Sequence, residues 1–331
     1  MKNHHNDTPL SMSDFFYDLT PEHILSAIEQ VGQRSTGRCY ALNSLENRVY
    51  EVELEDNSKV VGKFYRPGRW TRDAILEEHE FLKDLAAAEI PVAEPLKLQD
   101  GSTLGTAEGG IMFSVFPKLR GRAPEELNDQ QLLQLGRFLG RIHNVGASKK
   151  ASHRILLTPE TYGVNPLKFL SENNWLSLEI ATRYKQVVQE ILDISTPWFA
   201  NIKTHRIHGD CHLGNLLYNN DGPFFLDFDD MVTGPPVQDL WLLVPGNDEQ
   251  ALKDRDVFLK GYTEMREFDF TSLRLVEPLR AFRFIHYSAW IAKRWKDPAF
   301  PRIFPDFNTH KYWSSELLDL EKQLNFIKTL N

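Results

Sequence analysis

The stretch between residues 208 and 230 holds the side chains of this sequence that are best suited to chemistry. It has the sequence HGDCHLGNLLYNNDGPFFLDFDD and contains Asp210, Asn215 and Asp227. A carboxylate such as Asp210 can accept the proton of an attacking hydroxyl group. Asn215 offers a neutral oxygen and Asp227 a charged one, and these are hard ligands that Mg²⁺ prefers while it keeps waters and phosphate oxygens. The pattern therefore predicts a proton acceptor beside a magnesium site.

The local sequence favours a tight loop followed by a strand. Gly209 and Gly214 allow a path in which the side chains of Asp210 and Asn215 face one site. The apolar run 224–226 is short and flanked by turn residues, which is typical of a buried strand. This strand would place a carboxylate at its end, beside the loop.

Three carboxylates, that of Asp227 included, follow one another closely after this run. Continued strand alternation would put Asp227 and Asp229 on one face, and Phe228 and Asp230 on the other. Three carboxylates this close repel one another unless a cation lies among them. The alternative is an ordinary loop followed by a solvated turn, since carboxylates after an apolar run usually cap something.

The spacing of these residues matches one known reaction. Protein kinases use a carboxylate, an amide five residues later and a carboxylate after a strand to transfer a phosphoryl group from ATP. We therefore expect Asp210 and Asp227 to be catalytic, Asn215 and Asp227 to bind Mg²⁺, and ATP to be the co-substrate.

A lysine and a glutamate in the first quarter of the chain are candidates for orienting ATP phosphates. Lys63 lies on an expected strand over 60–65, and Thr71 can cap a helix running to about residue 88. On that helix Glu78 shares the apolar stripe, where an unpaired charge is costly. We expect a Lys63–Glu78 ion pair of the kind found in kinases, although a surface lysine and a helix-face glutamate are the alternative.

The sequence has no Gly-x-Gly-x-x-Gly loop. The corresponding place, between the first two expected strands, is LNSLENRVY at 42–50. There Ser44 and Asn47 can supply a hydroxyl, an amide and turn-forming backbone to hold phosphate. A simple turn would have the same composition.

The change from strand to linker after residue 116 suggests a boundary between two lobes. FPKLRG at 116–121 has the Pro and Gly of a linker. We expect an N-terminal, nucleotide-binding lobe over 1–116, a hinge over 117–121 and a C-terminal lobe over 122–331. Main-chain atoms of Phe116 and Lys118 would then bind the adenine ring.

Other segments have clear helix or strand patterns. A strand over 40–54 forms a hairpin with 60–65, and 111–116 is a further strand. Thr20 and Pro21 begin a helix over 21–30. Asp239, in the first turn of a helix over 237–243, could accept backbone N–H bonds from the catalytic loop. Further helices are expected over 127–144, within 148–200 and over 273–295.

Composition narrows the class of protein. With 331 residues and 41% hydrophobic content the chain can bury a large core. Its net charge of -8 argues against nucleic-acid binding. Two distant cysteines, Cys39 and Cys211, suggest a reducing compartment, and no apolar run is long enough for a membrane span. We expect a soluble, cytoplasmic monomer that binds neither nucleic acid nor membrane.

Taken together, these motifs resemble a known family. The chain resembles the aminoglycoside phosphotransferase and choline kinase-like superfamily and, within it, the bacterial stress response kinase A family. The resemblance spans nearly the whole chain. It is carried by LNSLENRVYEV at 42–52, KFYRPGRWTRDAILEEHEF at 63–81, HGDCHLGN at 208–215, DFDD at 227–230, GPPVQDLW at 234–241, EPLRAFRFIHYSAW at 277–290 and DPAFPRIFP at 297–305.

The resemblance implies an α+β, two-lobed protein-kinase-like fold, with a small β-rich N-terminal lobe carrying one main helix and a larger, mainly helical C-terminal lobe. It implies an ATP- and Mg²⁺-dependent serine/threonine protein kinase of the bacterial stress response that acts on protein substrates and phosphorylates itself. It makes Asp210 the proton acceptor, makes Asn215 and Asp227 magnesium ligands and places Ser44 at the ATP site. The missing glycine loop and APE-type segment leave the recognition of a peptide substrate unexplained.

Three alternatives differ in chemistry. A small-molecule kinase for an aminoglycoside, choline or homoserine would use the same fold. A metal-dependent phosphoesterase would explain the sequence GDCH at 209–212, but it needs further metal ligands that do not follow. A non-catalytic pseudokinase predicts the loss of Lys63, Asp210 or Asp227, and all three are present.

Overall fold

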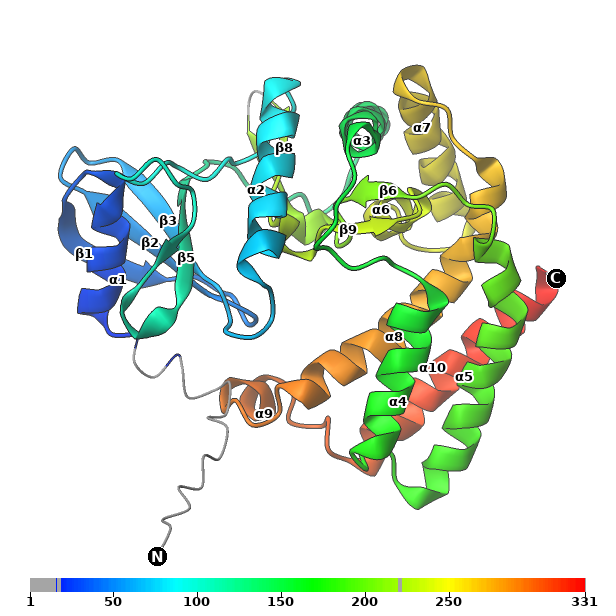
Figure 1. Cartoon of the computed structure of the whole chain (residues 1–331). Coiled ribbons are helices and arrows are strands. Elements are labelled where there is room, and N and C mark those ends of the chain that lie inside the picture. The colour runs from blue at the N-terminus through cyan, green and yellow to red at the C-terminus, as the bar shows by residue number, and fades with distance from the viewer. Residues whose placement is uncertain (1–15, 17–18, 220–221, 331) are drawn as a thin grey trace, which may run out of the picture. The chain divides into compact units, whose positions relative to one another are not determined.

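The computed structural model describes residue 16 and residues 19–219 and 222–330. The described residues form two compact units (Figure 1). The first contains residues of Met1–Leu76, Pro95–Lys118 and Arg294–Ile303, and the second those of Glu77–Glu94, Leu119–Lys293 and Phe304–Asn331. Each unit thus combines three segments, whereas the expected lobes are continuous stretches. The lobe boundaries and the hinge over 117–121 stay a proposal.

The first unit is built on a five-stranded antiparallel sheet with the order β1-β2-β3-β5-β4 (Figure 1). The β2–β3 hairpin confirms the sequence prediction and pairs Glu53 with Lys59. The expected strand over 40–54 is wrong in its first part, because the polar residues 42–47 form a loop between β1 and β2. The strands are β1 (Ser35–Ala41), β2 (Arg48–Leu54), β3 (Lys59–Phe64), β4 (Gly105–Thr106) and β5 (Met112–Pro117).

Helix α1 (Pro21–Ile28) packs against this sheet. Its start agrees with the prediction, because the Thr20 hydroxyl accepts the His23 N–H at 3.4 Å. Ile24 and Ile28 join the buried core of the unit. A Cβ atom at Gly62 on β3 would lie 2.4 Å from Ile28 Cδ1, so the absence of a side chain there lets the helix approach the strand.

Helix α2 (Arg72–Ala87) also begins as predicted, with the Thr71 hydroxyl accepting the Ala74 N–H at 3.2 Å. Its first turn belongs to the first unit, where Ile75 packs with Tyr65 and Leu104. From Glu77 onward the helix belongs to the second unit. A short helix, α9 (Ala299–Ile303), completes the first unit.

The second unit is mainly helical. Two of its helices, α3 and α7, approach closely, because a Cβ at Gly136 would lie 2.0 Å from the carbonyl oxygen of Phe258. Helix α5 packs against α10, which also packs against α8 (Figure 1). The helices are α3 (Asp129–Ser148), α4 (Asn165–Glu172), α5 (Leu178–Phe199), α6 (Val237–Leu243), α7 (Glu249–Met265), α8 (Val276–Lys293) and α10 (His310–Thr329).

Two small antiparallel pairs hold the loops that carry the predicted site. Strand β6 (His205–Ile207) pairs with β9 (Val232–Gly234), and β7 (Leu216–Asn219) pairs with β8 (Gly222–Phe225). The loop with Asp210 and Asn215 therefore runs from β6 to β7, and Asp227 lies between β8 and β9. Within the described residues, no helix is both long and apolar enough to cross a membrane.

Candidate active site

The loop after β6 is held in place by the buried side chain of Asp239 at the start of α6. Its Oδ2 accepts the N–H of His208 and its Oδ1 the N–H of Gly209, both at 2.8 Å. The prediction that Asp239 accepts backbone N–H bonds from this loop is confirmed. Gly209 has φ +85°, and a Cβ there would lie 2.2 Å from the carbonyl oxygen of Asp230, so the two loops meet at this glycine.

A histidine supports Asp239 from behind. His143 Nε2 lies 3.2 Å from Asp239 Oδ2, and its Nδ1 lies 2.9 Å from the hydroxyl of Tyr262. Burial lowers the pKa of His143, although the hydrogen bond to Asp239 opposes this. The ring is therefore neutral, and the network assigns its Nε2 proton to Asp239 while Nδ1 accepts from Tyr262. Residues from α3, α6 and α7 thus fix the loop.

Asp210, the predicted proton acceptor, has both carboxylate oxygens engaged. Oδ1 lies 2.7 Å from Nη1 of Arg283 on α8, and Oδ2 lies 3.4 Å from Nε2 of His212. Burial raises the pKa of the Asp210 carboxyl, but the His212 hydrogen bond and the Arg283 charge outweigh it and hold the pKa well below its usual range. Asp210 is ionised at neutral pH, as a proton acceptor must be.

Asn215 lies at the end of the same loop. Its side-chain amide donates to the carbonyl oxygen of Asp210 at 3.0 Å, which fixes the plane of the amide and turns Oδ1 away from that carbonyl. The Leu226 N–H donates to the carbonyl oxygen of Asn215 at 2.9 Å. This bond places Asn215 directly beside the residue that precedes Asp227.

The residues after β8 do not continue the strand, so the predicted alternation of carboxylates is wrong. Asp227 has the left-handed conformation, φ 57° and ψ 63°, which an aspartate tolerates better than most residues. This turns the chain into a 3₁₀ turn over Phe228–Asp230, and Asp229 is buried while Asp227 is exposed. The three carboxylates therefore do not share one face.

Asn215 and Asp227 have side chains of the kind that Mg²⁺ prefers, and they lie on neighbouring loops. The two residues come from loops joined by the bond between Leu226 and Asn215, and they offer one amide and one carboxylate. Magnesium typically takes one or two carboxylates and completes its shell with water and phosphate. No cluster of three His, Cys, Asp or Glu that could hold a metal occurs among the described residues, and a two-metal phosphoesterase needs such clusters.

Glu78 on α2 points inward, as predicted, and is only 1% exposed. Its Oε2 lies 3.0 Å from Nη2 of Arg154, whose Nη1 donates to the carbonyl oxygen of Asp229 at 2.7 Å. Arg154 thus ties α2 to the turn after Asp227. The sequence does not reveal Arg154 as a site residue, because it lies in an irregular segment whose pattern indicates no partner.

The remaining nucleotide-binding candidates lie in the first unit. Lys63 is buried on β3, with Nζ 5.4 Å from the ring centroid of Tyr65. Because Lys63 and Glu78 belong to different units, their ion pair stays a prediction. Ser44 is exposed in the loop between β1 and β2. In the same loop the Asn47 side-chain oxygen accepts the N–H of Arg66 at 3.1 Å, so it anchors the loop to the chain after β3.

Phe116 and Lys118 lie at the end of β5. Phe116 pairs with Val61 of β3, and the N–H of Lys118 donates to the carbonyl oxygen of Lys59 at 3.2 Å. The Lys118 ammonium lies 2.9 Å from a carboxylate oxygen of Glu51. Because the main-chain N–H of Lys118 is already hydrogen-bonded, only the carbonyl group of the Lys118 main chain could bind adenine.

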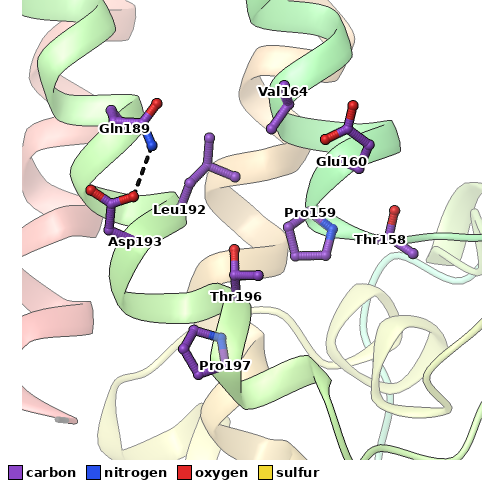
Figure 2. Close-up of a pocket in the computed structure, with 9 residues that line it drawn as sticks. All are labelled: Thr158, Pro159, Glu160, Val164, Gln189, Leu192, Asp193, Thr196 and Pro197. Atoms are coloured by element: carbon purple, nitrogen blue, oxygen red, sulfur yellow. Dashed lines mark hydrogen bonds between the residues drawn. The ribbon is translucent and has the colours of Figure 1, made fainter.

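A pocket of about 630 Å³ lies elsewhere in the second unit, between α5 and the chain that leads into α4 (Figure 2). Gln189 and Asp193 on its α5 wall are hydrogen-bonded at 2.8 Å. None of the predicted site residues lines it. The pocket is therefore separate from the site built around Asp210.

Two solved structures show which fold this chain has. The structure is similar to an amicoumacin kinase in complex with AMP-PNP, Ca²⁺ and Ami, with a TM-score of 0.70, 20% identity and coverage of 87% of this chain and 92% of that one. It is also similar to a microcompartment-associated aminopropanol kinase, with a TM-score of 0.69, 17% identity and coverage of 91% and 98%. The fold is the α+β fold of these kinases.

Sequence similarity identifies the family. Residues 41–276 match the phosphotransferase enzyme family. The chain is 39% identical to stress response kinase A of Escherichia coli K12 over 299 residues, 90% of each chain. It is 37% identical to the serine/threonine protein kinase RdoA of Salmonella typhimurium over 313 residues, 94% of each. The chain belongs to the phosphotransferase enzyme family, which confirms the resemblance, and it is a kinase that transfers phosphate to an alcohol group.

Proposed function

We propose that this chain is an ATP- and Mg²⁺-dependent serine/threonine protein kinase of the bacterial stress response that also phosphorylates itself. The observation that carries this proposal is the similarity, over 90–94% of their length, to proteins named stress response kinase A and serine/threonine protein kinase RdoA. The site built around Asp210 has the groups that this reaction needs. The kinase acts as a monomer on protein substrates in the cytoplasm, where ATP is available.

The proposed mechanism assigns one task to each group of the second unit. Asp210 accepts the proton of the acceptor hydroxyl as its oxygen attacks the γ-phosphate. Asp239 holds the loop so that the carboxylate is in place before substrate arrives. Asn215 and Asp227 would hold Mg²⁺, which when bound neutralises charge on the β- and γ-phosphates.

Four residues of the first unit, and Glu78 of the second, would take part in nucleotide binding or in its support. Lys63 would contact the phosphates and pair with Glu78, and Ser44 would contact the phosphates from its loop. Main-chain atoms of Phe116 and the carbonyl group of Lys118 would bind the adenine ring at the hinge over 117–121, between lobes over 1–116 and 122–331.

A small-molecule kinase is the second candidate. It is favoured by the similarity in fold to the amicoumacin and aminopropanol kinases, whose acceptors are small molecules. The phosphate chemistry would be the same in both cases, so the acceptor decides between them.

The test is to incubate the purified full chain with labelled ATP, Mg²⁺ and either generic proteins or small alcohols, and to follow the label. We expect label in protein Ser and Thr residues, including those of the kinase itself. The Asp210→Asn variant is the control for contaminating kinases. Transfer only to small alcohols would refute the protein-kinase proposal and support the second candidate.

A further inference from the structure

The contact between Arg283 and Asp210 is unexpected for a proton acceptor. A hydroxyl that gives its proton to Asp210 must come within about 3 Å of a carboxylate oxygen. Arg283 Nη1 already lies 2.7 Å from Oδ1, and His212 lies 3.4 Å from Oδ2. Each carboxylate oxygen can accept a second hydrogen bond, so an acceptor hydroxyl on Oδ1 would share that oxygen with Arg283. The position of Arg283 is thus part of the acceptor site.

Arg283 differs from the structural arginines of the same unit in its freedom to move. Arg154 has a fully buried side chain held by Glu78 and a backbone carbonyl. Arg280, on the same helix as Arg283, pairs with Glu277 and lies over the Trp241 ring. The side chain of Arg283 is 38% exposed, and its single hydrogen bond within the described residues is to Asp210. It can turn toward another anion without losing any other partner.

The exposed surface beside Arg283 is aromatic. Tyr287 follows one helical turn later and stacks on Trp290, with ring centroids 5.4 Å apart. Arg283 and Tyr287 are four residues apart on α8, so their side chains lie on the same face of the helix. The charge of Arg283 opposes the rise that burial causes in the pKa of Tyr287. A guanidinium beside aromatic rings suits a peptide segment that carries a carboxylate, because arginine binds carboxylates with directed, charge-assisted hydrogen bonds. The same guanidinium repels a polycation such as an aminoglycoside.

We infer that Arg283 determines acceptor specificity: it holds Asp210 until a carboxylate of the acceptor draws it away, so that Ser or Thr residues beside Asp or Glu are preferred. This inference rests on the proposed function and names its substrate class. The reaction itself is unchanged. The acceptor oxygen forms a bond to the γ-phosphorus, the bond to the ADP oxygen breaks, and the hydroxyl proton passes to Asp210.

The experiment compares three serine peptides that differ only in flanking residues, which are acidic, neutral or basic, as acceptors for the full chain with Mg²⁺ and ATP. For the unmodified protein we expect kcat/KM to be about tenfold higher for the acidic than for the neutral peptide, mainly through KM. In Arg283→Gln this ratio should fall close to one, and Arg283→Lys should keep part of it, because the charge remains.

A matched control removes a different arginine that is paired with a carboxylate. Arg183 on α5 is 53% exposed and pairs with Glu321 of α10 at 2.7 Å rather than with a residue of the catalytic loop. Arg183→Gln should keep the preference for the acidic peptide. If Arg283→Gln kept the preference for the acidic peptide, the inference would be overturned. An equal loss of kcat for all three peptides would also overturn it, because that result would show a structural role for Arg283.

A failure of the proposed function would give a different experimental result from a failure of the inference about Arg283. If the unmodified protein transfers phosphate to no peptide, the same comparison is made with an anionic alcohol, glycerate, and a cationic one, ethanolamine. A preference for glycerate that Arg283→Gln abolishes would support the role of Arg283 and refute the protein-kinase proposal alone. A preference for ethanolamine would overturn the role of Arg283 as well.

Discussion

At the scale of single residues, Asp210 combines a pKa below its usual range with a carboxylate that is only partly buried. Asp210→Asn keeps the shape and the hydrogen bond from Asn215 to the backbone but cannot accept a proton. We expect kcat to fall by about 10²–10⁴-fold, the usual contribution of a general base, while affinity for an ATP analogue stays within about threefold. Label transfer and calorimetric titration measure the two quantities.

The control for this variant is Asp319→Asn, because Asp319 is an exposed carboxylate paired with Lys322 on α10. It should have unmodified kinetics. If Asp210→Asn turned over at a rate near that of the unmodified protein, Asp210 would not be the proton acceptor.

Candidate site residues that lie close together in the sequence could be found from it, and those that come from distant parts of the chain could not. Asp210, Asn215 and Asp227 lie within a short stretch, so their spacing alone indicates chemistry. Arg283 contacts Asp210 from 73 residues away, and Arg154 contacts Asp229 from 75 residues away. Nothing in the local sequence of either arginine indicates these partners, because tertiary packing creates them.

At the scale of elements, the start of α6 fixes the catalytic loop through Asp239. Asp239→Asn would leave one oxygen for the two N–H groups of His208 and Gly209, so one of them loses its acceptor. A buried group that loses its partner costs about 1–3 kcal/mol. We expect a lower melting temperature and a kcat reduced by about tenfold or more, since the loop that carries Asp210 loosens.

Asp248→Asn is a matched control for this variant. Asp248 is the N-cap of α7, and its Oδ1 accepts the Ala251 N–H at 2.9 Å. Asparagine is as good an N-cap as aspartate, so the melting temperature and kcat should stay unchanged. Unmodified kcat in Asp239→Asn would show that the loop does not depend on this carboxylate.

Helices α5, α8 and α10 meet at a buried carboxyl group, Glu316. It accepts hydrogen bonds from Tyr184 at 2.5 Å and from Ser288. Burial raises the pKa of Glu316 to about 7, although these hydrogen bonds oppose the rise. Between the ordinary glutamate pKa and about pH 7, Glu316 is protonated in the folded protein but ionised in the unfolded chain. The free energy of unfolding therefore decreases as the pH rises through this range.

We predict that the melting temperature falls between about pH 5 and pH 8 and that Glu316→Gln reduces this fall, because glutamine stays neutral. The shift corresponds to stability on the order of 3 kcal/mol. Thermal melts of both proteins across this range measure it. Glu321→Gln, at a half-buried position of the same helix, is the control. Equal slopes for Glu316→Gln and the unmodified protein would contradict the prediction.

Helices and strands with clear periodicity could be predicted from the sequence. A turn of the chain within a short polar segment could not. The β2–β3 hairpin, α2 and α6 follow from alternation, capping residues and helical stripes. The turn at Asp227 depends on one residue in the left-handed conformation, which alternation of apolar residues does not reveal. The strand expected over 40–54 included the loop over 42–47 for a different reason, because the alternation of residues 50–54 does not show where the strand begins.

At the scale of the whole molecule, the chain returns to its first unit near the C-terminus, which no local pattern in the sequence indicates. Residues Arg294–Ile303 belong to that unit. Asp297 Oδ2 lies 2.9 Å from Nη2 of Arg66, which is almost fully buried, and 3.4 Å from Nη2 of Arg48. Glu46 lies 2.6 Å from Nε of Arg294. Buried ion pairs therefore attach the returning segment to the loop before β2 and the chain after β3.

We predict that Asp297→Asn loosens the first unit and leaves the second unchanged. Asparagine can still accept the Ala299 N–H, as Asp297 Oδ1 does at 3.0 Å, so the variant removes the charge and little else. Breaking a buried pair costs about 3–5 kcal/mol, and the remaining contact of Arg66 with Glu46 puts the expected loss at the lower end. Amide hydrogen exchange should therefore accelerate by about 10²-fold in β2 and β3 but not in α5.

The control for Asp297→Asn makes the same change in an exposed turn of the same unit. Asp100 Oδ1 accepts the Ser102 N–H at 2.8 Å, a bond that asparagine preserves, and no ion pair is lost with it. Asp100→Asn should leave exchange in β2 and β3 unchanged. Equal protection of these strands in both variants would mean that the returning segment is held by its apolar contacts, such as buried Phe300, rather than by the charge of Asp297. Faster exchange in α5 as well would mean that the two units unfold together, because a local loss in the first unit would then be felt throughout the chain.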